Sequence, residues 1–350
     1  MTTLWDTTGS NVVKALGAER RSAGALAFGL ALTLVVVVDE QHVAEAEEAA
    51  TTAAAAHPCR LLVVVRRQID SPTPRLDAEV SIGGRLGPGE AVVMRMYGRL
   101  ALHAESVVLP LLAPDAPVVT WWHGEPPDRI AYDPLGVFAD RRVTDTTAAP
   151  DPVAALRQRA VDYVPGDVDL AWTRTTPWRT LLAAAYDQVT EQATGATVVS
   201  AEHDPSAHLV AGWLRSRLGV PVGTQEVARR RQLASIRIDI GDGKICLDRK
   251  DSRTAELTLV GGPQRVMPLA DRDLGDLLAE ELRRLDVDAT YSDALSAWSG
   301  IPGLSARPTV REHVWRDPMA PAAANGALAA TAAPSSGAAT DSGSSTGSAG

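Results

Sequence analysis

Apolar and polar positions along the first half of this chain follow the pattern of an α/β fold. A β-branched apolar run over 33–38 is followed by an Ala- and Glu-rich segment over 43–56 and by a second apolar run over 61–65. A strand, a helix of about a dozen residues and another strand form a β-α-β unit, which implies parallel pairing of the two strands. The same patterning predicts antiparallel strands over 76–82 and 91–97, a short helix over 101–111, a strand over 117–122, and helices over 151–163 and 178–189.

The second half of the chain repeats this order of elements. Its pattern predicts a strand over 197–200, a helix that begins after Asp204-Pro205 and ends at Gly219, a hairpin of strands 235–240 and 244–247, a strand over 256–260 and a helix from Asp271. We therefore predict two mixed-sheet α/β domains, over 1–150 and 151–318. A degenerate duplication would explain the similar order, although no residue-level repeat supports it.

Two segments need a separate interpretation. From residue 320 onward the chain is almost entirely Ala, Gly, Ser, Thr and Pro, so we expect a disordered tail over 319–350 that cannot offset its ordering entropy. The apolar stretch 23–38 follows two arginines, as an export signal would, but it is shorter than the roughly 20 residues that span a bilayer. Its β-branched end favours a buried strand, so we expect no membrane segment.

Composition and charge restrict the classes of partner. The 350 residues carry a net charge of −9, which argues against a nucleic-acid binder because such proteins need a basic face. The two cysteines, Cys59 and Cys246, are far apart in sequence and cannot form a disulfide framework. A reducing cytoplasm is therefore the expected compartment. The abundance of Ala, Val, Gly and Arg is typical of a GC-rich bacterial genome.

Motifs of catalysis are not recognisable in the sequence. There is no Gly-rich phosphate loop ending in Lys-Ser/Thr, no three-glycine dinucleotide fingerprint and no nucleophile elbow. His203 and His208, with Glu202 and Asp204 beside them, lie at a strand-to-helix junction where α/β sheets bind ligands, so a metal site there is an alternative to a structural role. The interpretation that we prefer is a chain without metal, cofactor or catalytic residues.

A second metal alternative concerns Asp167-Val168-Asp169. This Asp-x-Asp form holds a divalent metal in many sugar transferases, but three residues match widely by chance. We instead expect Asp169 to pair with Arg174 or Arg179.

Large aromatic side chains are concentrated in two strings that also carry arginine. Four of the eight tryptophans lie in the strings 118–127 and 167–179. Trp and Arg anchor interfaces because each combines a large contact area with a directional polar group. The strings either fill the seam between two domains or form a pocket for a phosphate-bearing ligand at the helix start near Thr176. The residues that we predict to bind a partner or a ligand are Trp121, Trp122, Asp169, Trp172, Arg174, Trp178 and Arg179.

These strings also carry a resemblance to a known family. The most specific match is Asp169-Leu170-Ala171-Trp172-Thr173-Arg174 followed by Pro177-Trp178-Arg179; weaker matches are Leu32–Val36, His57-Pro58-Cys59-Arg60 and Val118-Val119 leading to Trp121-Trp122. Over about residues 5 to 300 the chain resembles the glucose-6-phosphate dehydrogenase assembly protein OpcA family of actinobacteria and cyanobacteria. The resemblance implies a non-catalytic partner that promotes assembly or allosteric activation of glucose-6-phosphate dehydrogenase in the pentose phosphate pathway.

Two other functions remain open at this point. An enzyme or sensor on the same scaffold would bind a sugar phosphate or nucleotide-sugar at the tryptophan and arginine strings. A purely structural scaffold would hold several pathway enzymes together, with the tail as a tether. A redox switch of the kind attributed to some relatives is not expected here, because Cys59 and Cys246 are so far apart in sequence.

Overall fold

The structure is a computed structural model that describes residues 1–23, 30–83, 89–228 and 232–309. Within these ranges the strands form two mixed sheets, with helices packed against both, which confirms the predicted α/β class. The predicted tail over 319–350 and part of the apolar stretch 23–38 lie outside the described residues. Among the described helices, none combines the length and apolarity that crossing a membrane requires.

The first sheet has eight described strands, mostly parallel. Their order is β1 (Thr2–Leu4), β4 (Arg75–Ile82), β5 (Glu90–Tyr97), β3 (Cys59–Arg67), β2 (Leu32–Asp39), β6 (Val118–His123), β7 (Arg141–Thr144) and β8 (Asp167–Asp169). Strands β5 to β8 in this order run parallel, whereas β4 and β1 are antiparallel to their neighbours. The predicted β-α-β unit and the predicted antiparallel pair are both confirmed.

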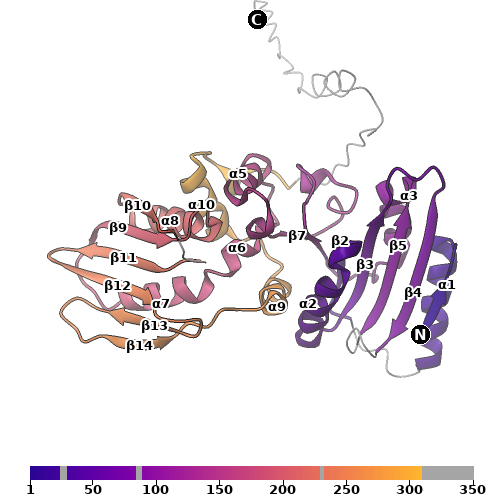
Figure 1. The fold of residues 1–350 in the computed structure, drawn as a ribbon, viewed down its shortest axis with the longest axis horizontal. Coiled ribbons are helices and arrows are strands. Elements are labelled where there is room, and N and C mark those ends of the chain that lie inside the picture. The colour runs from indigo at the N-terminus through magenta and orange to yellow at the C-terminus, as the bar shows by residue number, and fades with distance from the viewer. Residues whose placement is uncertain (24–29, 84–88, 229–231, 310–350) are drawn as a thin grey trace, which may run out of the picture. The chain divides into compact units, whose positions relative to one another are not determined.

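Both faces of the first sheet are covered, which explains its continuous apolar strands. Helix α2 (Val43–Ala56) packs its alanines on one face. Helix α1 (Gly9–Ala23) packs Val12 and Leu16 on the other, and Figure 1 shows the two helices on opposite sides of the sheet. A sheet with apolar side chains on both faces needs such cover, because neither face can be left in water.

The second sheet has six described strands and one apolar face. Their order is β10 (Val222–Glu226), β9 (Ala193–Ser200), β11 (Ser235–Ile240), β12 (Gly243–Arg249), β13 (Thr254–Thr258) and β14 (Arg265–Pro268). Only β9 and β10 pair in parallel. Helices α7 (Thr176–Tyr186) and α8 (Pro205–Leu218) pack on the apolar face, and the predicted hairpin is confirmed.

Further helices join these layers. Helix α5 (Pro152–Asp162) follows the first sheet, α9 (Leu274–Arg283) packs on α2, and α10 (Ala289–Ser299) packs on α8. Gly212 and Gly275 permit the two close helix contacts, since a Cβ on Gly212 would lie 2.1 Å from the carbonyl oxygen of Ala294 and one on Gly275 would lie 2.6 Å from Thr52 Cβ. Strand β8, beyond residue 150, completes the first sheet; the domain division at 150 stays a prediction.

Several sequence-based details differ from the structure. The helix expected over 101–111 is broken into α3 (Arg99–Leu102), α4 (Glu105–Val108) and a 3-10 turn that contains Pro110. A proline inside a helix removes a backbone donor and clashes with the preceding turn. The suggested duplication extends only to one β-α-β unit, because β10 is an edge strand whereas its counterpart β3 lies between two strands.

Candidate functional site

The second tryptophan and arginine string folds as β8, the single-turn helix α6 (Leu170–Thr173) and α7. Asp169 is the N-cap of α6: its carboxylate accepts the hydroxyls of Thr144 (2.7 Å) and Thr146 (2.9 Å) and the N–H of Thr146 and Ala171. Asp169 is fully buried, and these donors satisfy both oxygens. The expected pairing of Asp169 with Arg174 or Arg179 is therefore wrong.

Trp172 lies in the packed interior at the start of this string. Its side chain is 1% exposed, and its Nε1 donates to Asp288 Oδ2 at 2.8 Å. The guanidinium of Arg179 stacks 3.5 Å from the centroid of the indole, and burial lowers the pKa of Arg179 to about 10. Trp172 thus joins α6 to the start of α10, both within the predicted second domain, so this hydrogen bond is a packing contact inside that domain.

Arg174 points away from Trp172. Residues 170–173 are helical, and side chains two positions apart on a helix point in different directions, so the two side chains diverge. Arg174 instead donates from both terminal nitrogens to Asp145 at 2.8 and 2.7 Å, and its side chain is 30% exposed. It therefore reaches a surface that a ligand or partner can contact.

The start of α7 also differs from the expected cap. Thr175, and not Thr176, is the N-cap residue, and its hydroxyl donates to the carbonyl oxygen of Trp172 at 2.7 Å. Trp178 is 2% exposed and packs into the apolar core of the second sheet.

The first string lies within the first sheet. Strand β6 lies between β2 and β7, so Trp121 and Trp122 lie in an interior strand and not at the edge of the sheet. Each indole is 1% exposed, and the two point to opposite faces because side chains alternate along a strand. His123 stacks on Trp121 with ring centroids 5.1 Å apart. These tryptophans are core residues in this conformation.

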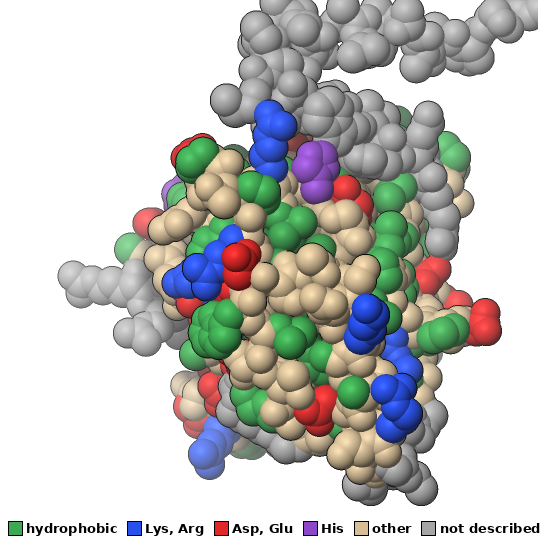
Figure 2. Space-filling view, turned by 90° about the vertical axis from the view of Figure 1, so that its right-hand side faces the viewer, with side chains coloured by type: hydrophobic (Ala, Val, Ile, Leu, Met, Phe, Trp, Pro, Cys, Tyr) green, Lys and Arg blue, Asp and Glu red, His purple; other side chains and the backbone are tan. Residues whose placement is uncertain are grey.

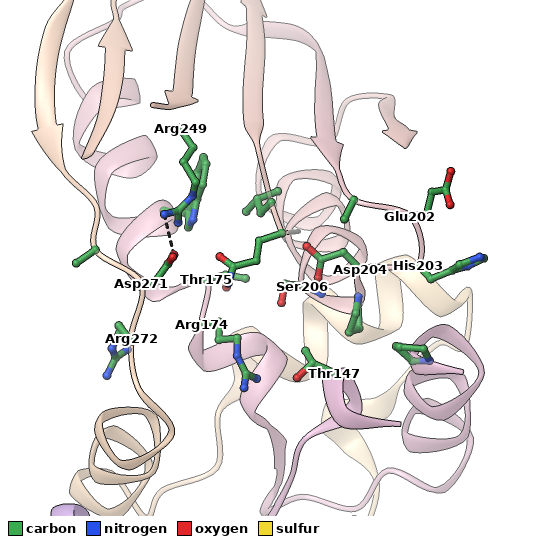
Figure 3. Close-up of a pocket in the computed structure, with 17 residues that line it drawn as sticks. Thr147, Arg174, Thr175, Glu202, His203, Asp204, Ser206, Arg249, Asp271 and Arg272 are labelled. Carbon is green, nitrogen blue, oxygen red and sulfur yellow. Dashed lines mark hydrogen bonds and ion pairs between the residues drawn. The ribbon is translucent and has the colours of Figure 1, made fainter. Parts of the chain in front are cut away.

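A cavity of about 410 Å³ lies where the second string meets the carboxyl end of β9 and the start of α8. Figure 3 shows Arg249 and Asp271 on one side of this cavity and Asp204 and Ser206 on the other, whereas Glu202 and His203 point away. Further lining residues are Thr147, Arg174, Thr175, Trp178, Gln232, Leu233 and Arg272. Of the predicted site residues, only Arg174 and Trp178 line it.

Arg249 and Asp204 lie on facing walls of the cavity. Arg249, the last residue of β12, donates to Asp271 Oδ1 at 2.8 Å and lies 5.3 Å from the ring centroid of Trp178. Asp204 caps α8 by accepting the N–H of Ser206 at 2.9 Å. Burial raises the pKa of Asp204, against the opposing effects of Ser206 and Arg174. The sequence predicted Asp204 as a cap but contained no signal for Arg249.

The metal alternatives do not hold in the described part of the chain. No group of three or more His, Cys, Asp or Glu side chains there could hold a metal ion. His208 lies beside Trp298, with ring centroids 5.4 Å apart, and His203 is exposed. Arg142 pairs with Asp167, which occupies one carboxylate of the Asp-x-Asp form.

The two cysteines are free and buried. Burial raises the pKa of the Cys59 thiol to about 12, so almost none of it is thiolate at neutral pH.

Trp5 is a surface tryptophan that lies outside both strings. It is 70% exposed, while every other described tryptophan is buried or half-buried. A groove of about 710 Å³ lies nearby along α1, with Val13, Leu100 and Val107 among its lining residues. Figure 2 shows the face on this side of the molecule, where hydrophobic side chains are interspersed with arginine, lysine and acidic residues. Exposure of a single indole has no periodic signal in sequence.

Comparison with protein families gives two adjacent matches. The family model described as the glucose-6-phosphate dehydrogenase subunit N-terminal domain matches residues 50–161, and the one described as the C-terminal domain of the same subunit matches residues 165–295. Together they cover most of the described chain, including both tryptophan and arginine strings.

Two cyanobacterial relatives are named OxPP cycle protein OpcA. The one from Synechococcus elongatus is 29% identical over 215 residues, which is 57% of this chain and 44% of the relative. The one from Synechocystis is 26% identical over 201 residues, 54% of this chain and 39% of the relative. The matched region thus spans less than half the length of either relative.

Oxidoreductases are among the solved structures that the comparison found. An oxidoreductase from Sinorhizobium meliloti has a TM-score of 0.46 at 9% identity, covering 79% of this chain and 97% of the other. A 3-ketoreductase from Actinomadura kijaniata, solved with NADP and TDP-benzene, has a TM-score of 0.44 at 12% identity, covering 80% and 97%. Similarity at this level does not transfer activity.

Proposed function

This chain belongs to the glucose-6-phosphate dehydrogenase assembly family, OpcA, and from this premise we propose that it is a non-catalytic factor that assembles or activates glucose-6-phosphate dehydrogenase. The observation that carries the proposal is the pair of adjacent family matches over 50–161 and 165–295. The named relatives support it, because both carry the name of an oxidative pentose phosphate cycle protein.

The physical basis of activation is linkage. A factor that binds the oligomeric or active enzyme more tightly than the inactive form shifts that equilibrium by its differential affinity. A preference of about 1.4 kcal/mol changes the ratio of the two forms tenfold. The role therefore requires a binding surface and no catalytic residue in this chain.

The predicted partner-binding residues divide into two groups under this proposal. Trp121, Trp122, Trp172 and Trp178 are core residues that support the surface. Asp169 fixes the turn at α6, and Arg179 stacks on Trp172 and belongs to the same supporting group. Arg174 is the member of the second string that we propose to contact a partner or ligand directly, because its side chain is 30% exposed. The buried cysteines agree with a reducing, cytoplasmic compartment.

The experiment is a rate titration. Glucose-6-phosphate dehydrogenase from the same organism is assayed alone and with increasing amounts of the full chain. We expect a saturable increase in rate, with the chain alone showing no dehydrogenase activity. An unchanged rate at every ratio would contradict activation, and an intrinsic activity of the chain would contradict the non-catalytic role.

A further inference from the structure

The cavity beside α8 has the size and place of a small-molecule site. Its volume of about 410 Å³ lies within the roughly 300–1,000 Å³ of typical ligand pockets. It opens at the carboxyl end of β9, which pairs in parallel with β10, and ligands of α/β sheets bind at such ends. The polar groups on its walls then determine which class of ligand it fits.

One wall holds a hydrogen-bond acceptor without a donor. Asp204 Oδ1 accepts the N–H of Ser206, whereas Asp204 Oδ2 is buried and has no partner among the described residues. An unpaired buried acceptor costs about 1–3 kcal/mol, and more when the group is charged. A ligand hydroxyl that donates to Oδ2 would remove this cost.

Arg249, on the facing wall, has a nitrogen that can donate a further hydrogen bond. The contacts of Arg249 to Asp271 Oδ1 and to the carbonyl oxygen of Leu269 both use Nη1, at 2.8 and 3.2 Å. Its Nε is buried and has no partner among the described residues. The side chain of Asp271 is 43% exposed, so water screens this pair and an anion can compete for the guanidinium. Guanidinium groups bind phosphate oxygens through two parallel hydrogen bonds.

Two further arginines line the cavity. Arg174 and Arg272 each have a carboxylate partner, Asp145 and Glu280 respectively, and the charge of Arg174 also acts on Asp204. The unpartnered groups on the two walls are therefore the Nε of Arg249 and the Oδ2 of Asp204. A ligand that suits both walls has an anionic end and hydroxyl groups.

We propose that this cavity binds a sugar phosphate, with the phosphate on Arg249 and a sugar hydroxyl donating to Asp204. The inference does not rest on the proposed function, because the site lies within this chain and binding needs no dehydrogenase. A ligand with an anion alone would leave Asp204 Oδ2 unpaired, and a neutral sugar would leave the Arg249 Nε without an anionic partner.

Isothermal titration of the full chain tests the proposal with three probes: glucose 6-phosphate, glucose and inorganic phosphate. We expect glucose 6-phosphate to bind with a Kd of about 1 mM or tighter, and each of the other two at least about tenfold more weakly. Glucose 6-phosphate without measurable heat would overturn the proposal. Inorganic phosphate that binds as tightly as glucose 6-phosphate would show that the cavity binds only the anion. Glucose that binds as tightly would show that Arg249 makes no contribution to binding. Either result contradicts the assignment.

Two variants locate the site. Arg249→Gln removes the cation, and Asp204→Asn removes the acceptor charge while keeping a good N-cap for α8. We expect each to weaken glucose 6-phosphate binding at least about tenfold. Arg217→Gln, on the same helix and 47% exposed outside the cavity, is the matched control and should bind as the parent does.

Circular dichroism and the urea midpoint establish that each variant is folded. If Arg249→Gln does not fold, Asp204→Asn decides the question alone. Parent-like affinity in the folded variants would place the ligand elsewhere and contradict the proposal.

Discussion

Trp172 is predicted from the sequence to be a binding residue, but in the structure it is a core residue. In the sequence it lies at the centre of a string that is predicted to bind a partner or a ligand, and a residue with that role alone would tolerate replacement without loss of folding. In the structure it is 1% exposed and hydrogen bonded to Asp288. Aromatic residues anchor cores and interfaces through the same large apolar area, so sequence alone does not separate the two.

We therefore predict that Trp172→Ala lowers the free energy of unfolding by about 3–5 kcal/mol, because it leaves a large cavity and removes the hydrogen-bond donor of Asp288 Oδ2. Trp5→Ala, at a side chain 70% exposed, is the control and should change stability by no more than about 0.5 kcal/mol. Urea denaturation measures both. A Trp172→Ala protein with the parent's midpoint and a lost effect on the dehydrogenase would restore the interface interpretation.

A buried ion pair provides the second residue-level prediction. Arg141 donates from Nε to Glu281 Oε2 at 2.9 Å, and Thr173 donates to Glu281 Oε1 at 2.6 Å. The side chains of Arg141 and Glu281 are 4% and 6% exposed. Removing one partner leaves an uncompensated buried charge, which costs about 3–5 kcal/mol.

Glu281→Ala should accordingly lower the free energy of unfolding by about 3–5 kcal/mol in the same denaturation assay. Asp293→Ala breaks the exposed pair with Arg217, whose side chains are 47% and 40% exposed, and should cost no more than about 1 kcal/mol. Equal effects of the two substitutions would show that Arg141 and Glu281 are solvated in solution.

A half-buried histidine contributes to the pH dependence of stability. Burial lowers the pKa of His208, and the charges of Arg215, His203 and Arg157 act in the same direction against Glu226. Below the unfolded pKa the unfolded chain takes up a proton that the folded chain resists, so His208 makes stability fall as the pH drops through 6.5 toward the lowered folded pKa. Thermal melts from pH 7.5 to 5.5 should therefore fall less steeply for His208→Phe than for the parent; an identical slope would contradict this.

Among the elements, the close contact between helices α8 and α10 positions the start of α8 at the cavity. Helix α8 begins at the cavity with Asp204 and crosses α10 at Gly212. A Cβ at Gly212 would lie 2.1 Å from the carbonyl oxygen of Ala294, so the helices must separate to accommodate it. Backbone atoms cannot move aside as a flexible side chain can.

Gly212→Ala should therefore cost about 1–3 kcal/mol of stability and weaken ligand binding in the cavity. Gly223→Ala is the control, because nothing lies within 4 Å of a Cβ at that position. Thermal melts compare the two variants. A Gly212→Ala protein as stable as Gly223→Ala would mean that α8 and α10 are not in close contact.

Local elements were the part of the fold that the sequence predicted well. The helix expected over 43–56 occurs as Val43–Ala56, and the caps at Asp151 and Asp204 and the αL end at Gly219 are confirmed. These features depend on short-range rules: the apolar period, a side chain that caps its own helix, and a glycine that tolerates positive φ.

Contacts between distant elements could not be predicted in the same way. Arg141 and Glu281 are 140 residues apart, and Trp172 and Asp288 are 116 apart. Arg174 could pair with any nearby carboxylate in sequence, and the structure places Asp145 there through the parallel neighbours β7 and β8. The cavity could not be predicted for the same reason, because Arg249 at the end of β12 and Asp204 after β9 are brought to facing walls by the order of strands in the second sheet.

For the whole molecule, the assembly role and the sugar phosphate site are supported by different observations. The assembly role rests on the family matches over 50–161 and 165–295, whereas the sugar phosphate site rests on the cavity at Arg249 and Asp204. Suppose that this chain binds the dehydrogenase and a sugar phosphate, and that the sugar phosphate changes the affinity for the dehydrogenase. Linkage then requires the dehydrogenase to change the affinity for the sugar phosphate by the same factor.

Analytical ultracentrifugation of the organism's glucose-6-phosphate dehydrogenase, with and without the full chain, measures assembly directly through the mass of the enzyme. We predict a complex that contains both proteins and a larger fraction of enzyme in its highest oligomer. Two proteins that sediment independently, with the enzyme's oligomer distribution unchanged, would contradict the assembly role.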